Sequence, residues 1–154
     1  MMNSGKKITC RTLVVLMALV TAAVALADHH GDEEAITQAV LNYTNALYEV
    51  KPGLVDKSVS PRVQKVGYVP DQEGSGYREM WMTFEDLKEL TAHWNKDGHV
   101  DPSAAKREVK ILDKLDQTAT VRLDAEWGID FIHLAKSGDK WMIMNVIWQT
   151  YPPE

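Results

Sequence analysis

The chain has 154 residues, of which 45% are hydrophobic and 25% are charged, and its formal net charge is −5. These values exclude a disordered polyelectrolyte, a collagen-like repeat and a multi-span membrane protein, and they fit one globular domain. Residues 1–27 contain three basic and no acidic residues, so the remaining 127 residues carry 14 basic and 22 acidic side chains and a charge of −8. No nucleic-acid partner is expected, because such proteins need clustered Lys and Arg to displace counterions from phosphates.

The first 27 residues have the pattern of a secretory signal peptide. Three basic residues precede an apolar run over residues 13–26, which ends in the cleavage-site pattern Ala25-Leu26-Ala27. The run is about 14 residues long, whereas a membrane-spanning helix needs ~20. We therefore predict a signal peptide (residues 1–27) and an exported domain (residues 28–154), periplasmic or secreted, with no membrane association after cleavage. An uncleaved membrane anchor is the alternative.

Cysteine use and motifs exclude several kinds of chemistry. The single cysteine, Cys10, lies in the predicted signal peptide, so the mature domain has no disulfide, no thiolate nucleophile and no cysteine-ligated zinc. No H-E-x-x-H, G-x-S-x-G, Walker or dinucleotide-binding glycine motif occurs. We expect no cofactor.

Cleavage after Ala27 would create a candidate metal site at the new N-terminus. The mature protein would begin Asp28-His29-His30. The α-amine of Asp28, two backbone amides and the imidazole of His30 can form a square-planar nitrogen set, which suits copper(II) or nickel(II). A polar leader without a metal is the alternative, because chain termini are commonly loose.

The first half of the domain predicts two amphipathic helices and a hairpin. Apolar residues recur every three or four positions from Ile36 to Val50, and an irregular stretch with Pro61 as a breaker follows over residues 54–62. Next come strands over residues 64–69 and 77–82, joined by a glycine-containing loop, and then a helix. Two signals predict where this helix starts and ends: a capping box of Thr83 with Asp86, and a left-handed glycine end near Asp97-Gly98.

The second half alternates with a period of two and predicts strands. They begin at Lys106, Ala119, Trp127 and Trp141, with a glycine-containing hairpin between the last two. The last two strands are apolar on both faces, so both faces need a cover. Helices supply one cover and a second subunit would supply the other, which predicts a homodimer through this sheet.

The closing residues resemble a known family. Its members carry an Asp-aromatic-x-His-Leu-x-Lys strand, a Gly-x-x-Trp hairpin and a final Asn-x-x-Trp strand, which match residues 130–136, 138–141 and 145–148 here. With the order of elements, they resemble the "putative lumazine-binding" subgroup of the nuclear transport factor 2-like superfamily. The resemblance implies a cone-shaped α+β fold, in which N-terminal helices pack on a curved antiparallel sheet, and a pteridine-like ligand. That fold hosts isomerases, dehydratases, binding proteins and dimerisation modules.

Two polar residues in an apolar strand are the candidates for chemistry. Asp130 lies between Ile129 and Phe131, where a carboxylate is either paired with Lys or Arg or has a raised pKa suited to a general base. His133 is either a hydrogen-bonded structural histidine or an auxiliary acid. Because residues three apart in a regular strand face opposite sides, Asp130 and His133 form no dyad unless a β-bulge separates them.

Aromatic residues give a further prediction. Tyr43 on the first helix, Trp94 on the second helix and Phe131 and Trp148 on the last strands are the residues that we expect at a ligand. Packing in the core or at an interface is the alternative for each of them.

Three functions follow from these observations. The first is an exported, dimeric protein that binds a small aromatic or amphipathic molecule in a cone-shaped cavity. The second is a cofactor-independent isomerase or lyase, with Asp130 as base, Tyr43 as donor to a developing oxyanion and His133 as acid. The third is an interaction module whose cavity is filled by side chains.

Overall fold

The structure is a computed structural model that describes residues 31–73 and 76–152. The predicted signal peptide and the candidate metal site at Asp28 and His30 lie outside the described residues. From Glu34 onward the described residues form one compact unit. Within the described ranges, no helix has the length and apolar character needed to cross a membrane, and no three metal-ligating side chains cluster.

Six strands form one sheet in the order β2-β1-β6-β5-β4-β3. Their bounds are β1 Val59–Pro70, β2 Tyr77–Met82, β3 Arg107–Lys114, β4 Thr118–Ala125, β5 Gly128–Ser137 and β6 Lys140–Gln149. Neighbouring strands are antiparallel except β1 and β6, which are parallel. The predicted antiparallel sheet is therefore a mixed sheet, because the chain leaves β1 and returns beside it only after four further strands.

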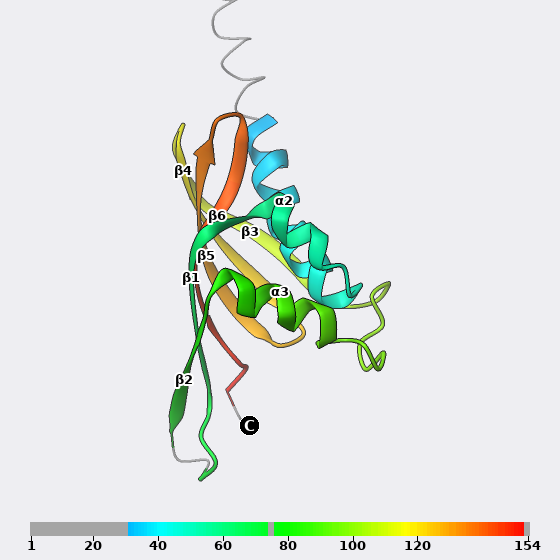
Figure 1. Cartoon of the computed structure of the whole chain (residues 1–154). Helices are drawn as coiled ribbons and strands as arrows, with labels where there is room; N and C mark the ends of the chain where they lie inside the picture. The colour runs from blue at the N-terminus through cyan, green and yellow to red at the C-terminus, as the bar shows by residue number, and fades with distance from the viewer. Residues whose placement is uncertain (1–30, 74–75, 153–154) are drawn as a thin grey trace, which may run out of the picture. The chain divides into compact units, whose positions relative to one another are not determined.

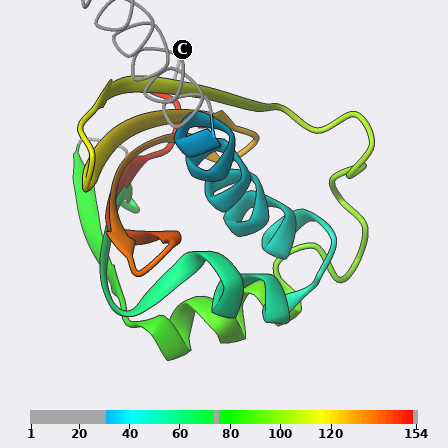
Figure 2. The same cartoon turned by 90° about the horizontal axis from the view of Figure 1, so that it is seen from above.

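The helices cover one face of this curved sheet (Figures 1 and 2). The first helix covers residues 31–48, followed by the short helices η1 (Pro52–Leu54) and α2 (Val55–Ser58), and α3 spans Phe84–His93. Figure 2 shows the sheet bending around the first helix. The side chains between these layers form the hydrophobic core, which includes Ile36, Val40, Val55, Leu87, Val121, Leu123, Ile132 and Ile143.

Helix α3 begins as the sequence predicts and ends earlier. The side chain of Thr83 accepts a hydrogen bond from the backbone of Asp86, and the Asp86 carboxylate accepts one from the backbone of Thr83, which completes the capping box. The last helical residue is His93 rather than Asp97, because the backbone bonds that follow are of the tighter i to i+3 kind. Gly98 has φ of +72°, the left-handed conformation expected of it.

Strand β1 is longer than its sequence pattern indicates. It begins at Val59 rather than residue 64, and residues 55–58 before it are helical rather than irregular. Pro61 has no backbone N–H to donate, yet it is tolerated inside the strand. The pairing between β1 and β6 shifts register between Val59 and Gln64, so no hydrogen bond between these strands requires an N–H at this position. This longer strand carries a buried lysine, Lys65, into the space beneath the helices.

A register shift between β5 and β6 changes which residues share a face. The shift falls between His133 and Leu134 of β5. Strict alternation would place Ile143 and Trp148 on opposite faces, whereas both are buried against the core with Val146. The irregularity thus brings the Trp148 side chain to the face that the helices cover.

Candidate functional site

A cavity of about 400 Å³ lies between the helices and the sheet. The first helix, β1, β2, α3, the turn before β5 and the end of β6 all contribute to its walls. The lining side chains are mostly apolar or aromatic, and they are Tyr43, Leu47, Lys65, Val69, Met80, Met82, Leu90, Trp94, Trp127, Trp148 and Thr150. Three of the four aromatic residues predicted at a ligand, Tyr43, Trp94 and Trp148, therefore meet at one cavity.

Three buried polar groups form a hydrogen-bonded chain at the wall of this cavity. The Lys65 ammonium donates to the Tyr43 hydroxyl at 2.7 Å, and that hydroxyl donates to Asp130 Oδ2 at 2.8 Å. Lys65 is 3% exposed, while Tyr43 and Asp130 are fully buried. Lys65 Nζ and Asp130 Oδ2 are 3.9 Å apart, so the tyrosine hydroxyl bridges the two charged groups. We call Lys65, Tyr43 and Asp130 the buried cluster.

Both oxygens of Asp130 are occupied. Oδ2 accepts from Tyr43, and Oδ1 accepts from the indole N–H of Trp127 at 2.7 Å. Asp130 does not line the cavity, whereas Tyr43, Lys65 and Trp127 do. The carboxylate therefore influences a bound molecule only through the positions and charges of these three side chains.

Burial shifts the pKa of both cavity-facing members of the buried cluster. Burial raises the pKa of the Tyr43 phenol well above its usual value, and the negative charge of Asp130 raises it further, so the phenol stays protonated at neutral pH. Burial lowers the pKa of Lys65 to about 8, although the charge of Asp130 opposes the shift. A lysine with this pKa is suited to proton transfer near neutral pH, whereas the phenol stays neutral and serves as a hydrogen-bond donor.

Aromatic side chains hold the cavity wall in place. The ring of Trp127 lies 5.5 Å from Tyr48, 5.6 Å from Trp94 and 6.2 Å from Tyr43. The ammonium of Lys65 lies 4.9 Å from the ring of Trp148, a distance at which cation–π attraction partly compensates for lost hydration.

Gly67 makes room for the Trp148 indole. A Cβ atom at Gly67 would lie 2.0 Å from the Trp148 ring, so the ring packs directly on the backbone of β1. This close approach fixes the indole beside Lys65, which lies two residues earlier on the same face of the strand.

His133 and Phe131 lie on the other face of the sheet. His133 is exposed and its Nδ1 is 3.2 Å from Asn145 Oδ1, and Phe131 is 45% exposed. The structure thus separates Asp130 from His133, as the spacing predicts, and leaves no dyad between them. Phe131, the fourth aromatic residue predicted at a ligand, does not line this cavity: it lines an apolar groove of about 440 Å³, with Ile129 and Ile147 among its neighbours.

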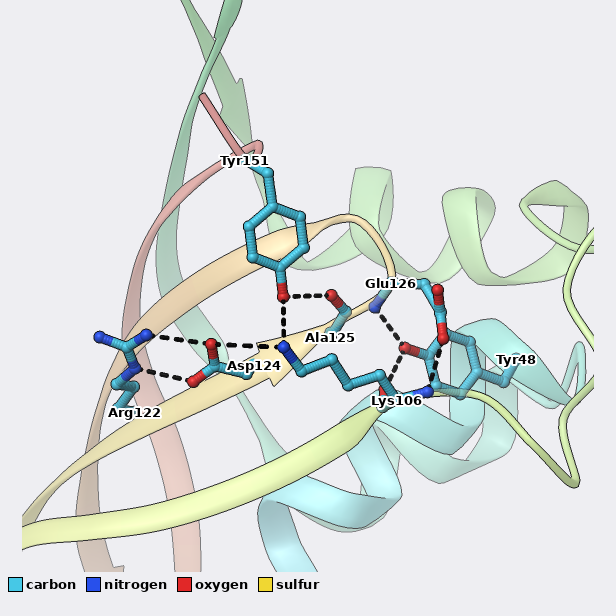
Figure 3. Close-up of polar contacts among 7 residues, drawn as sticks. All are labelled: Tyr48, Lys106, Arg122, Asp124, Ala125, Glu126 and Tyr151. Carbon is cyan, nitrogen blue, oxygen red and sulfur yellow. Dashed lines mark hydrogen bonds and ion pairs between the residues drawn. The ribbon is translucent and has the colours of Figure 1, made fainter. Parts of the chain in front are cut away.

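A second set of polar contacts lies at the ends of β3 and β4 (Figure 3). Lys106 Nζ donates to the Tyr151 hydroxyl at 3.1 Å and lies 3.8 Å from Asp124 Oδ1, and that hydroxyl donates to the Ala125 carbonyl at 3.0 Å. We call Lys106, Tyr151 and Asp124 the exposed cluster, since the side chain of Lys106 is 40% exposed. Here the hydrogen bond to Tyr151 raises the pKa of the lysine.

Tyr48, which Figure 3 also shows, links this region to the wall of the cavity. The Tyr48 hydroxyl donates to the Lys106 carbonyl at 2.7 Å and accepts from the backbone N–H of Glu126 at 2.9 Å. Tyr48 is thereby fixed between the first helix and the sheet, in contact with the indoles of Trp94 and Trp127.

Lys65 and Trp127 are the site residues that sequence reasoning missed. Period-two alternation from Val63 to Val69 does place Lys65 on one face with apolar neighbours, and this was the available signal. The hydrogen bond from Trp127 to Asp130 had no comparable signal, since Trp127 lies in the turn between β4 and β5.

The curved sheet, the helices on one of its faces and the cavity between them define an α+β protein of the nuclear transport factor 2-like class. One similar solved structure is an NTF-2-like protein of unknown function from Silicibacter pomeroyi, with a TM-score of 0.63, 15% identity and coverage of 79% of this chain and 98% of that chain. Another is an NTF2-like protein of unknown function from Shewanella baltica, with a TM-score of 0.63, 19% identity and coverage of 80% and 96%. A third, described as a putative scytalone dehydratase from Novosphingobium aromaticivorans, has a TM-score of 0.55, 14% identity and coverage of 81% and 87%.

The sequence identifies the family within this class. The model of the family described as "Putative lumazine-binding" matches residues 31–149, and the chain belongs to that family. No curated protein matches the chain in sequence.

Proposed function

We propose that this chain is an exported small-molecule-binding protein whose ligand is planar, mostly apolar and held in the cavity described above. The cavity itself carries the proposal: its volume of about 400 Å³ falls in the range of roughly 300–1,000 Å³ typical of small-molecule sites. A phenol and three indoles supply flat walls. The alternative of a pure interaction module requires side chains to fill this space, which they leave open.

One end of the cavity favours a polar group on the ligand. Lys65 provides an ammonium there, beside the Trp148 ring. Within the described residues, Trp148 Nε1 and Thr150 Oγ1 are buried and have no hydrogen-bond partner, and both residues line the cavity. Because buried polar groups are normally hydrogen-bonded, a ligand with a carbonyl or other acceptor at this end fits the site better than a hydrocarbon.

Native mass spectrometry of the protein purified from its own host tests the proposal by detecting a co-purifying small molecule. A titration with lumazine, followed by tryptophan fluorescence, tests the pteridine class that the family description suggests. Leu90→Trp adds an indole at the cavity wall and should abolish both signals. Phe131→Trp adds the same ring on the opposite face and should leave them intact. Equal binding by both variants would contradict a ligand in this cavity.

A second candidate function is a cofactor-independent isomerase or lyase, and the hydrogen-bonded buried cluster favours it. Since Asp130 is covered by its two donors, it would hold the Tyr43 phenol in position rather than act as the base itself. Tyr43 would then contact a developing oxyanion, and the neutral amine of Lys65, which lines the cavity, would take the α-proton. His133 takes no part in this version, because it lies on the other face. The structural similarity to a protein described as a scytalone dehydratase agrees with such chemistry but shows only the fold.

Exchange of the α-protons of cyclohexanone in heavy water, followed by NMR, tests this second function. Asp130→Asn should abolish exchange, and the surface variant His133→Asn should retain it. Exchange that is lost equally in both variants would remove the proposed role of Asp130.

The homodimer remains part of the proposal. The face opposite the helices presents Phe131 at 45% exposure and Ile147 at 43% exposure beside the apolar groove, and a second subunit would bury them. Sedimentation velocity should show a dimer, and the double variant Phe131→Lys with Ile147→Lys should give a monomer. A monomeric parent protein would contradict this part of the proposal.

Export and the N-terminal metal site are tested together. N-terminal sequencing of the protein recovered from its host should give Asp28 as the first residue. Copper(II) added to that protein should then produce a visible d–d band, which His30→Ala removes. If the protein begins at Asp28 but shows no such band, the result contradicts the metal site and not the export.

A further inference from the structure

Lys65 is held in surroundings that are unusual for a lysine. It is 3% exposed, and its ammonium lies 4.9 Å from the Trp148 ring and 5.3 Å from the Tyr43 ring. Lysine is rarely buried unless it is fully paired, because the loss of hydration costs several kcal/mol. The side chain is nevertheless one of those that line the cavity, so a bound molecule can reach it.

The contacts of Lys65 compensate its charge only in part. An ammonium has three N–H donors, and within the described residues Lys65 makes one hydrogen bond, to Tyr43. The nearest carboxylate oxygen, Asp130 Oδ2, is at 3.9 Å, too far for a direct hydrogen bond. Within the described residues, the other N–H groups of this ammonium therefore have no hydrogen-bond acceptor, and the cavity lies open beside them.

The surroundings also favour the neutral, nucleophilic amine. Burial lowers the pKa of Lys65 to about 8. At pH 7 roughly one chain in ten then carries the neutral amine, against fewer than about one in a thousand for a lysine of ordinary pKa. A neutral amine in a mostly apolar site is the usual arrangement for covalent catalysis by lysine.

We propose that Lys65 condenses with the carbonyl carbon of an aldehyde or ketone bound in the cavity and forms an imine. This inference rests on the proposed binding function and names the chemical class of the ligand.

The reaction needs no oxidant, reductant or further reactant. The amine nitrogen attacks the carbonyl carbon, the new N–C bond forms, and the π electron pair moves to oxygen. The nitrogen then gives up one proton and the oxygen takes one, which gives the neutral carbinolamine with a lone pair on nitrogen. A second proton reaches the hydroxyl, the C–O bond breaks and water leaves, while the nitrogen lone pair forms the C=N bond. In total, one ammonium and one carbonyl compound give one protonated imine and one water.

Tyr43 is placed to move the protons. Its hydroxyl is 2.7 Å from Lys65 Nζ, so it is also close to the oxygen of a carbinolamine formed there. Burial raises the pKa of the phenol, so it stays neutral, and it can pass its proton to the oxygen only while it receives one from Lys65 Nζ. Asp130 is the positioning residue, since it fixes both the Tyr43 hydroxyl and the Trp127 indole.

Two probes test the imine on the full chain. Benzaldehyde with cyanoborohydride reduces an imine to a stable benzyl amine, and intact mass and peptide mapping then count and locate the adducts. Acetylacetone forms a conjugated enaminone with a reactive lysine, which is followed by its near-ultraviolet absorbance. We expect one fast adduct per chain, on Lys65, in addition to any slower reaction at the N-terminal amine.

Variants identify the lysine and separate chemistry from binding. Lys65→Met and Lys65→Arg should each lose the fast adduct. Lys106→Met should keep it, although Lys106 has the same kind of tyrosine partner. Tyr43→Phe should slow adduct formation at least tenfold without changing its location, and circular dichroism confirms that each variant is folded.

The outcomes distinguish this inference from the binding function on which it rests. Adducts spread evenly over the surface lysines would overturn the imine at Lys65. Lumazine or a co-purified ligand that binds in the cavity, with no adduct from either probe, would overturn the imine alone. A chain that binds no ligand and forms no adduct would overturn the proposed binding function as well.

Discussion

Two lysines of this protein have nearly the same contacts in opposite surroundings. In both the buried and the exposed cluster, the ammonium donates to a tyrosine hydroxyl and lies just under 4 Å from a carboxylate. These two distances are 2.7 and 3.9 Å for Lys65, and 3.1 and 3.8 Å for Lys106. Each ammonium also lies just over 5 Å from the ring of its tyrosine.

The two lysines nevertheless differ in acidity. Burial lowers the pKa of Lys65 to about 8, whereas the hydrogen bond to Tyr151 raises the pKa of Lys106. The identity of its partners therefore does not decide the pKa of such a lysine. Loss of hydration does, because water solvates the charge of one ammonium and reaches the other hardly at all. Reactivity is therefore expected at Lys65 and not at Lys106.

The largest expected effect comes from removing the carboxylate of each cluster, Asp130 in the buried one and Asp124 in the exposed one. Asp130→Ala leaves a lysine cation and two hydrogen-bond donors buried without their acceptor, so we expect a loss of about 3–5 kcal/mol in the free energy of unfolding at pH 7. Asp124→Ala in the exposed cluster removes the partner of Lys106 and of Arg122, which are 40% and 37% exposed, so water can solvate both cations and the change should cost about 1 kcal/mol or less. Urea unfolding followed by circular dichroism measures both losses, and similar values would contradict the assignment of the two environments.

A smaller effect is expected in the pH dependence of stability. The folded pKa of Lys65, about 8, is below the ordinary value of 10.5, so between these values the unfolded chain binds more protons than the folded chain. The cost of the buried charge is thus fully present below pH 8 and is relieved as the pH rises. The free energy of unfolding of the parent chain, relative to Lys65→Met, should rise by up to about 1.4 kcal/mol per pH unit between pH 8 and 10.

Lys106→Met is the control for this measurement. Because the pKa of Lys106 is raised rather than lowered, the stability difference between the parent chain and this variant should show no such rise over the same interval. A flat profile for both variants would mean that Lys65 titrates like an exposed lysine.

Much of the fold could be predicted because it depends on local patterns. The capping box at Thr83 and the strand pairs around the tight turns depend on residues near one another in sequence, and the structure contains them. The convergence of Tyr43, Trp94 and Trp148 at one cavity followed from the resemblance to a family.

The remaining parts of the site have no clear signal in the local pattern. Lysine is rarely buried, so the apolar residues on the same face of its strand did not mark Lys65 as part of the core. The irregular pairing between β5 and β6 brings Ile143 and Trp148 to one face, and the turn before β5 lets Trp127 reach Asp130. Neither a register shift nor the path of a turn follows from alternation, which assumes regular strands.

The smallest expected effect compares the two tyrosine hydroxyls. Tyr43→Phe removes the acceptor of Lys65 and one donor to Asp130 inside the core, so we expect a loss of about 1–3 kcal/mol, the cost of leaving buried polar groups unsatisfied. Tyr151→Phe removes a contact of the same kind at the surface, where water can take its place, and should cost about 1 kcal/mol or less. Thermal unfolding at pH 7 orders the two variants. If Tyr151→Phe lowers the stability more than Tyr43→Phe, the hydrogen bond from Tyr151 to the Ala125 carbonyl stabilises the sheet more than the buried cluster does.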